Sequence, residues 1–295
     1  MRYAISHRTT YQYDDAVSVS HHLLRLRPRD SAHQRTSSYN LRTEPAPTLL
    51  DFHQDYFGNT VTFITIEGPH RQMAVISECE VELEAKPLLD AAATPPWEDV
   101  RELCRGDVYG RGGEASEFCF SSTLIPLHPE FREYASSAFA PGRPVLEAGI
   151  ALMQKIKSEF KFDPEATTVT TPVDQVFRQR RGVCQDFAHL QIACLRAMGL
   201  PARYVSGYLE TVPPPGRPKL VGADASHAWL QLWCGDTGWI DLDPTNNLLP
   251  TERHITLAWG RDFADVSPLR GVLVGSGDHR LKVAVDVTPR DCPKT

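Results

Sequence analysis

The sequence predicts an α+β protein in which an amino-terminal antiparallel β region precedes a core of helices and strands. Residues 1 to about 85 alternate between apolar and polar side chains at the period of a strand. Helical patterns follow between about residues 144 and 198, and further alternating segments come after them. We therefore expect an all-β domain over 1–90, a linker and helical connection over 91–140, and a core over 141–295 that includes the carboxy-terminal strands.

The amino-terminal region is expected to resemble a β-sandwich. Glutamates occupy every second position from 78 to 84, with apolar residues between them. After a Gly58-Asn59 turn, Val61, Phe63 and Thr65 alternate with Thr62, Ile64 and Ile66. This alternation is typical of an antiparallel sheet with one solvent-exposed face. The run Ala-Ala-Ala-Thr-Pro-Pro at 91–96 then indicates a linker.

Three helices are expected next. A stripe of apolar residues from Val145 to Phe160 predicts a helix that begins near Pro144. Thr171 and Pro172 start a second helix, which ends near Gly182. The third runs from Cys184 to Met198, stops at Gly199, and is apolar on nearly every face, so it should be buried.

Cys184 lies in the first turn of this buried helix. Unpaired backbone N–H groups and the positive end of the helix dipole favour a thiolate there. A lone cysteine at a helix start is more commonly a small buried apolar residue, so partners must support a catalytic role. Asp186, in the same turn, should complement the dipole and could pair with Arg203.

His227 and Asp243 are the candidate partners of Cys184, and strand geometry brings them close to each other. Residues 227–233 and 239–243 alternate on either side of a turn at 234–238, which predicts a hairpin. If Trp233 pairs with Trp239, Asp243 lies diagonal to His227, with about 7–8 Å between Cα atoms. Asp243 could then hold one ring nitrogen while the other faces the thiol. Asp241 is the competing carboxylate.

The motifs together resemble one family. They are Arg181-Gly182-Val183-Cys184-Gln185-Asp186-Phe187-Ala188-His189, Arg203-Tyr204-Val205-Ser206-Gly207-Tyr208, Asp224-Ala225-Ser226-His227-Ala228-Trp229 and Trp239 through Asn246. In this order they resemble the bacterial transglutaminase-like cysteine proteinases, and Leu26-Arg27-Pro28-Arg29 and Asp55-Tyr56-Phe57-Gly58-Asn59 resemble the β region that precedes the core in that family. The resemblance implies a papain-like transglutaminase core, with Cys184 as nucleophile, His227 as general base and acid, and Asp243 as the orienting carboxylate.

The resemblance leaves the reaction open. Hydrolysis of a peptide or side-chain amide through a cysteinyl acyl-enzyme is the main hypothesis, transamidation to an amine is the alternative, and a non-catalytic protein-binding module is the third. The oxyanion should meet the backbone N–H of Cys184, and Gln185 and Tyr208 are candidates for a second donor. Trp229 could line a substrate channel or fill the core. The proline-rich segment 211–219 could form a wall or lid of the cleft, or a plain surface loop.

Composition limits partners and compartment. The net charge of −6 gives no electrostatic reason to bind nucleic acid, and no stretch approaches the ~18 apolar residues of a membrane span. Seven cysteines without a CxxC pair and a start without a signal-peptide pattern favour a cytoplasmic protein with reduced thiols and a peptide or protein substrate. No acidic calcium loop is visible, and a zinc site on Cys184, His227 and Asp243 would lack an evident fourth ligand, so no cofactor is expected.

Overall fold

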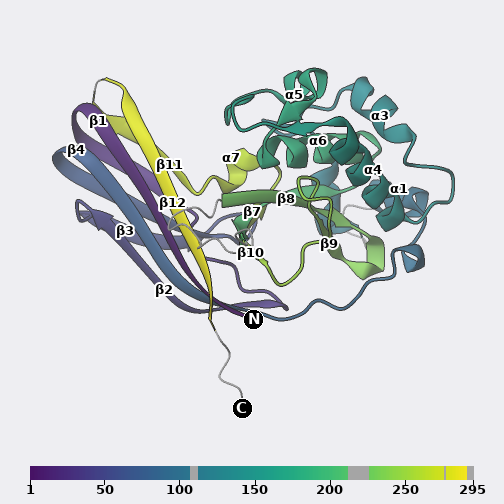
Figure 1. The fold of residues 1–295 in the computed structure, drawn as a ribbon, viewed down its shortest axis with the longest axis horizontal. Coiled ribbons are helices and arrows are strands. Elements are labelled where there is room, and N and C mark those ends of the chain that lie inside the picture. The colour runs from purple at the N-terminus through teal and green to yellow at the C-terminus, as the bar shows by residue number, and fades with distance from the viewer. Residues whose placement is uncertain (107–111, 212–225, 276, 291–295) are drawn as a thin grey trace, which may run out of the picture.

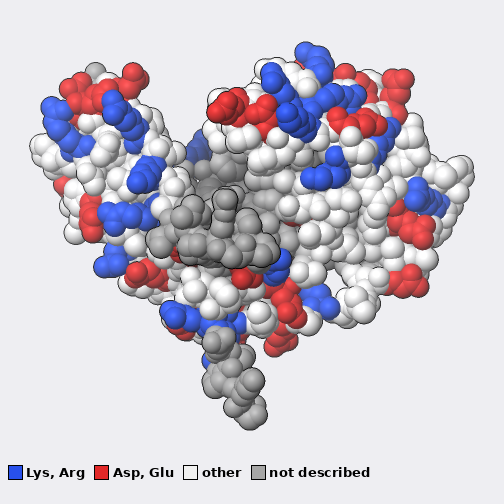
Figure 2. Space-filling model, viewed as in Figure 1, with Lys and Arg blue, Asp and Glu red and all other residues white. Residues whose placement is uncertain are grey.

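The computed structural model describes residues 1–106, 112–211, 226–275 and 277–290. Long strands form one lobe of the molecule, and helices around a smaller sheet form the other (Figure 1). Both lobes carry basic and acidic side chains on the face shown in Figure 2. The predicted α+β class is confirmed. Most of the proline-rich segment 211–219 lies outside the described residues.

The amino-terminal lobe is one six-stranded antiparallel sheet built on two long strands. Its first four strands are β1 (Arg2–Leu24), β2 (Gln34–Glu44), β3 (Leu49–Gln54) and β4 (Thr60–Leu83). β1 and β4 pair along most of their length, with register shifts between Gln12 and Val19. β2 pairs with the second half of β4 and β3 with the first half. Two half sheets therefore share their central strands, and they enclose a buried cluster that includes Tyr13, Leu24 and Ile64.

The last two strands also belong to this lobe. β11 (Leu269–Val274) and β12 (His279–Arg290) both pair antiparallel with β1, so the end of the chain lies beside its beginning. The prediction that the carboxy-terminal strands belong to the core was therefore wrong. Alternation identifies a strand but not its neighbour, and β1 has a second edge that these distant strands occupy.

The segment predicted as a linker and helical connection contains helices that pack on the core. Its elements are a 3-10 turn at Ala91–Ala93, α1 (Trp97–Gly106), α2 (Gly113–Ser116), a 3-10 turn at Glu117–Cys119 and α3 (Pro129–Ser136). Trp97, Val100 and Phe131 are buried in the same apolar cluster as the core helices. The core thus begins well before residue 141, because these side chains complete its apolar interior.

The remaining helices and strands form the core itself. The helices are α4 (Val145–Glu159), α5 (Val173–Gln179), α6 (Cys184–Ala197) and α7 (Phe263–Val266), and a two-residue parallel pair joins β5 (Lys161–Phe162) to β6 (Arg181–Gly182). The four-stranded sheet has the order β10 (His254–Gly260), β7 (Ala202–Leu209), β8 (Ser226–Trp233), β9 (Trp239–Leu242). As predicted, α6 is buried from Gln185 to Arg196, and it packs against β7 and β8. Among the described residues, no helix combines the length and apolarity needed to cross a bilayer.

Two side-chain amides join the lobes at β10, the edge strand of the core sheet. The Gln34 amide donates to the carbonyl of Thr256 and accepts from its N–H, both at 2.8 Å. The Asn59 amide does the same with Trp259, at 2.8 Å and 3.0 Å. An open strand edge exposes backbone groups that can pair with other chains, and these amides occupy part of that edge.

Candidate active site

The start of α6 holds Cys184 in place through a hydrogen-bonded carboxylate. Asp186 Oδ2 accepts from the backbone N–H of Val183 at 2.8 Å and from the hydroxyl of Thr167 at 2.6 Å. A Cβ at position 182 would lie 2.5 Å from this carboxylate oxygen, so Gly182 is required for the close approach. Cys184 is the first residue of α6 and is half buried. The backbone N–H groups of this first turn have no preceding helical carbonyl to bond.

The predicted ion pair between Asp186 and Arg203 does not form. The Arg203 guanidinium lies 4.2 Å from the ring centre of Trp239 and 3.9 Å from that of Trp259. Its Nε donates to Gln231 Oε1 at 2.7 Å. Stacking between two indoles holds the cation away from the start of α6.

The hairpin of β8 and β9 has the predicted register, with Trp233 opposite Trp239 and Leu230 opposite Leu242. Asp243 follows β9 directly and approaches His227, which lies near the start of β8. His227 Nε2 and Asp243 Oδ2 are 2.8 Å apart, and both side chains are buried. Asp241 instead accepts from the indole N–H of Trp229 at 2.8 Å and pairs with Lys86. The competing carboxylate therefore has a packing role.

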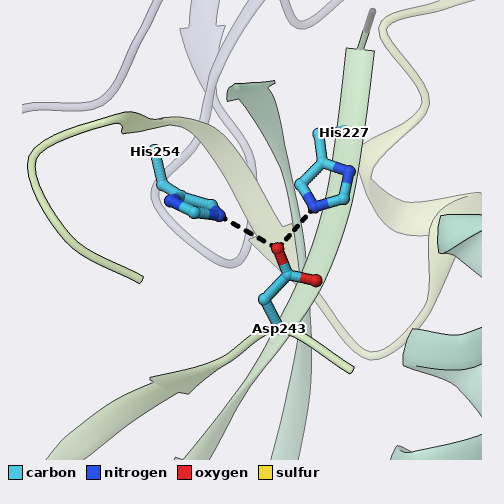
Figure 3. A group of neighbouring side chains, drawn as sticks. All are labelled: His227, Asp243 and His254. Carbon is cyan, nitrogen blue, oxygen red and sulfur yellow. Dashed lines mark hydrogen bonds and ion pairs between the residues drawn. The ribbon is translucent and has the colours of Figure 1, made fainter. Parts of the chain in front are cut away.

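His227 is hydrogen bonded to Asp243, and its electrostatics are coupled to both Asp243 and Cys184. One ring nitrogen points to Asp243 and the other points away from it (Figure 3). Burial alone would lower the pKa of His227, but hydrogen bonds with Asp243 and with Cys184 raise it to about 9. Burial would likewise raise the pKa of Asp243, yet hydrogen bonds from His227 and His254 hold it well below its usual range. The arrangement favours an imidazolium beside a carboxylate.

Sequence reasoning missed two neighbours of Asp243. His254 Nε2 lies 3.0 Å from Asp243 Oδ2, and the Asn246 amide donates to the same oxygen at 2.7 Å. Residues 254–259 alternate in a way that could have identified β10. That alternation, with a histidine at the first position, was the available signal for His254.

The side chains of the three oxyanion or substrate candidates are engaged elsewhere. Gln185 Nε2 donates to the carbonyl of Val169 at 3.1 Å. The fully buried Tyr208 hydroxyl bonds to His7 Nδ1 at 2.8 Å, across the boundary between the lobes. Trp229 is 1% exposed, and its N–H is occupied by Asp241. Tyr208 and Trp229 therefore lie in the interior of the protein.

A metal could in principle use three of these side chains. Ligand atoms of His227, Asp243 and His254 lie within 4.8 Å of one another. The two nitrogen to oxygen distances of 2.8 Å and 3.0 Å match charge-assisted hydrogen bonds. The geometry is accounted for by two imidazole N–H groups that donate to one carboxylate.

Cys184 is expected to be the first cysteine that iodoacetamide alkylates. Burial raises the pKa of Cys79 and of Cys234 to about 12. Cys104 is the main rival, because it is partly exposed and a hydrogen bond with Cys119 lowers the pKa of Cys104. Peptide mapping after brief labelling should find position 184 first, in the wild type and in Cys104→Ser. Earlier labelling of Cys104 or Cys234 would contradict the assignment.

Comparisons with known proteins agree with this architecture. The family described as "bacterial transglutaminase-like N-terminal region" matches residues 3–82, and the "transglutaminase-like superfamily" matches residues 132–244. An uncharacterized protein of Mycobacterium tuberculosis is 39% identical over 98% of this chain and 93% of its own length. An uncharacterized protein of Mycobacterium leprae is 33% identical over 97% of this chain and 98% of its own length.

Two further matches are to a transferase and to a solved structure. A protein-glutamine gamma-glutamyltransferase of Pseudomonas aeruginosa is 33% identical over 41% of this chain and 20% of its own length. A crystal structure from Cytophaga hutchinsonii, provisionally described as a cysteine protease, superposes with a TM-score of 0.76. It is 22% identical and covers 99% of this chain and 92% of that one, so it shows a shared fold.

Proposed function

The chain belongs to the transglutaminase-like superfamily, and from this membership and its site we propose a thiol-dependent hydrolase of peptide or side-chain amide bonds. The observation that carries the proposal is the environment of His227. Asp243 holds one ring nitrogen at 2.8 Å, and Cys184, at the start of a buried helix, is a second group that raises the pKa of the ring. A nucleophile beside a base that a third group orients is the arrangement needed for covalent acyl transfer.

The proposed reaction passes through a thioester. The Cys184 thiolate attacks the amide carbonyl, and the backbone N–H of Cys184 stabilises the oxyanion. The C–N bond breaks as the His227 imidazolium protonates the departing amine. Neutral His227 then takes a proton from water as the water attacks the thioester. The C–S bond breaks, which releases the acid and restores the Cys184 thiolate beside the His227 imidazolium.

The pH dependence should separate hydrolysis from thiol reactivity. With the pKa of His227 raised to about 9, its acidic form is present below that value and is lost as the pH rises through it. Turnover needs this proton for the leaving amine, so kcat/KM should fall about tenfold per pH unit above the limit. Alkylation needs the thiolate alone and should not fall there. The test is to measure kcat/KM and the alkylation rate side by side between pH 7 and 10.5. A fall of both quantities at the same alkaline pH would contradict the prediction.

Transamidation is the second candidate, supported by the match to the protein-glutamine gamma-glutamyltransferase over part of the core. In that reaction an amine, in place of water, would attack the same thioester. A purely protein-binding role is disfavoured because the cysteine, histidine and carboxylate are all retained and the last two are hydrogen bonded.

A peptide panel decides among these functions. Wild type and Cys184→Ala are incubated with glutamine-containing and ordinary peptides, with and without a millimolar primary amine, and products are measured by mass spectrometry. We expect free acid to dominate with wild type and no product with the variant. Amine adduct in excess of acid would favour the transamidase. Product formed equally by the variant would contradict both enzymatic proposals.

A further inference from the structure

His254 approaches the proposed catalytic carboxylate from the edge strand of the core sheet. It is the first residue of β10, and its side chain is 3% exposed. The ring packs edge to face against Trp229, with centres 5.2 Å apart and planes at 82°. Strand and indole together fix the ring, so that Nε2 lies 3.0 Å from Asp243 Oδ2.

The rings of His254 and His227 converge on one oxygen atom from two strands (Figure 3). A carboxylate only accepts hydrogen bonds, so each Nε2 must carry a proton. For His227 this requirement leaves Nδ1 free to accept the proton of Cys184. For His254 it leaves Nδ1 unprotonated, and that atom is buried with no hydrogen-bond partner among the described residues.

His254 donates to Asp243 as a neutral group. Burial lowers the pKa of His254, more than the Asp243 carboxylate opposes. The charged or titratable groups that face this cluster from the described residues are His227 on β8, Asp241 on β9, Asp243 after it, and Cys184 on α6 beyond His227. A second imidazolium here would repel His227, whereas a neutral N–H stabilises Asp243 without that repulsion.

We infer that His254 is a positioning residue that acts through Asp243, as a second hydrogen-bond donor that fixes the carboxylate and with it the tautomer of His227. The inference rests on the proposed function, since it gives His254 a part in the same reaction. It makes the site a chain of four side chains, Cys184, His227, Asp243 and His254, drawn from α6, β8, the end of β9 and β10.

Removing the His254 N–H donor should raise the pKa of His227. His254 shares the negative charge of Asp243 Oδ2 with His227. Without it, more of that charge acts on the His227 N–H, the imidazolium becomes more stable, and the pKa of His227 rises by roughly half to one unit. The looser carboxylate should also lower kcat by up to about 10²-fold, with little change in KM.

Two matched variants separate this role from packing. His254→Phe keeps a ring against Trp229 and removes the donor, whereas His254→Gln places an amide N–H near the position of Nε2. Imidazole ¹⁵N NMR follows the titration of His227 in both variants and in the wild type, with chelator present throughout. We expect an upward shift in His254→Phe and a value near the wild type in His254→Gln. The alkaline pH above which kcat/KM falls should shift in the same direction as the pKa of His227.

The titration needs no substrate, so it decides the inference even if the peptide panel yields no turnover. An unchanged His227 titration in His254→Phe would overturn the inference, as would a shift in His254→Gln as large as that in His254→Phe. The wild type alone provides a check if His254→Phe does not fold. His254 should be neutral and protonated at Nε2 from pH 6 to 9, and a charged ring or an Nδ1 proton would overturn the proposal.

Discussion

Cys184→Ala is expected to abolish turnover while leaving the fold intact. The thiol is the proposed nucleophile, and a methyl group offers no atom that can form the thioester. Loss of the nucleophile in a serine hydrolase costs about 10⁶-fold in kcat, and we expect a loss of that order here. Position 184 is only half buried and is the first residue of a helix. Alanine, a strong helix former, should therefore preserve the melting temperature.

The measurement is kcat on a peptide that the wild type hydrolyses, with circular dichroism melts as the control for folding. Cys184→Ser is the matched variant, because it keeps the shape and a hydroxyl but not the acidity of the thiol. Both variants should be inactive and should melt with the wild type. Retention of a few per cent of wild-type activity by Cys184→Ala would contradict the role of Cys184.

Asp243→Asn is expected to give the next largest loss of activity, because the Asp243 carboxylate accepts hydrogen bonds from several neighbouring donors. Its Oδ2 accepts hydrogen bonds from the side chains of His227, His254 and Asn246. Its Oδ1 accepts hydrogen bonds from the backbone N–H groups of Thr245 and Asn246. An asparagine amide must turn its NH₂ group toward one of these sets. When the NH₂ group faces His227, it donates to Nε2, so the neutral imidazole must carry its proton on Nδ1. Nδ1 can then no longer accept the proton of Cys184.

The loss should be about 10⁴-fold in kcat, as for the same change in a serine triad, where the wrong tautomer is the cause. Asp241→Asn is the matched control, since it can still accept the Trp229 N–H at Oδ1 and lies outside the hydrogen bonds to His227. It should lower kcat only slightly. A larger loss in Asp241→Asn than in Asp243→Asn would contradict the assignment of the orienting carboxylate.

The parts of this site that local pattern determines were predictable. The register of β8 and β9 follows from alternation on both sides of a short turn, so the meeting of His227 and Asp243 follows from the order of the residues alone. The burial of α6 follows from its apolar composition. Each of these conclusions depends on residues close together in the chain.

The parts that depend on distant pairing were not predictable. His254 reaches Asp243 because β10 pairs with β7, and alternation does not reveal which strand lies next to which. The same limit applies to β11 and β12. Arg203 was misjudged, and the role of Trp229 was left open, for a related reason. Their partners, two indoles and Asp241, are specified by packing across the sheet.

The pairing of β1 with β11 and β12 has a consequence for biosynthesis. β1 leaves the ribosome before the core, but two of its neighbours, β11 and β12, leave after the core. The core, from α1 to α7, is therefore an insertion between the two parts of one sheet, and it can be translated in full before that sheet can close. Contacts so distant in the chain form slowly. Translation thus leaves one edge of β1 unpaired until β11 and β12 emerge, a period in which a nascent-chain chaperone would have a strand to protect.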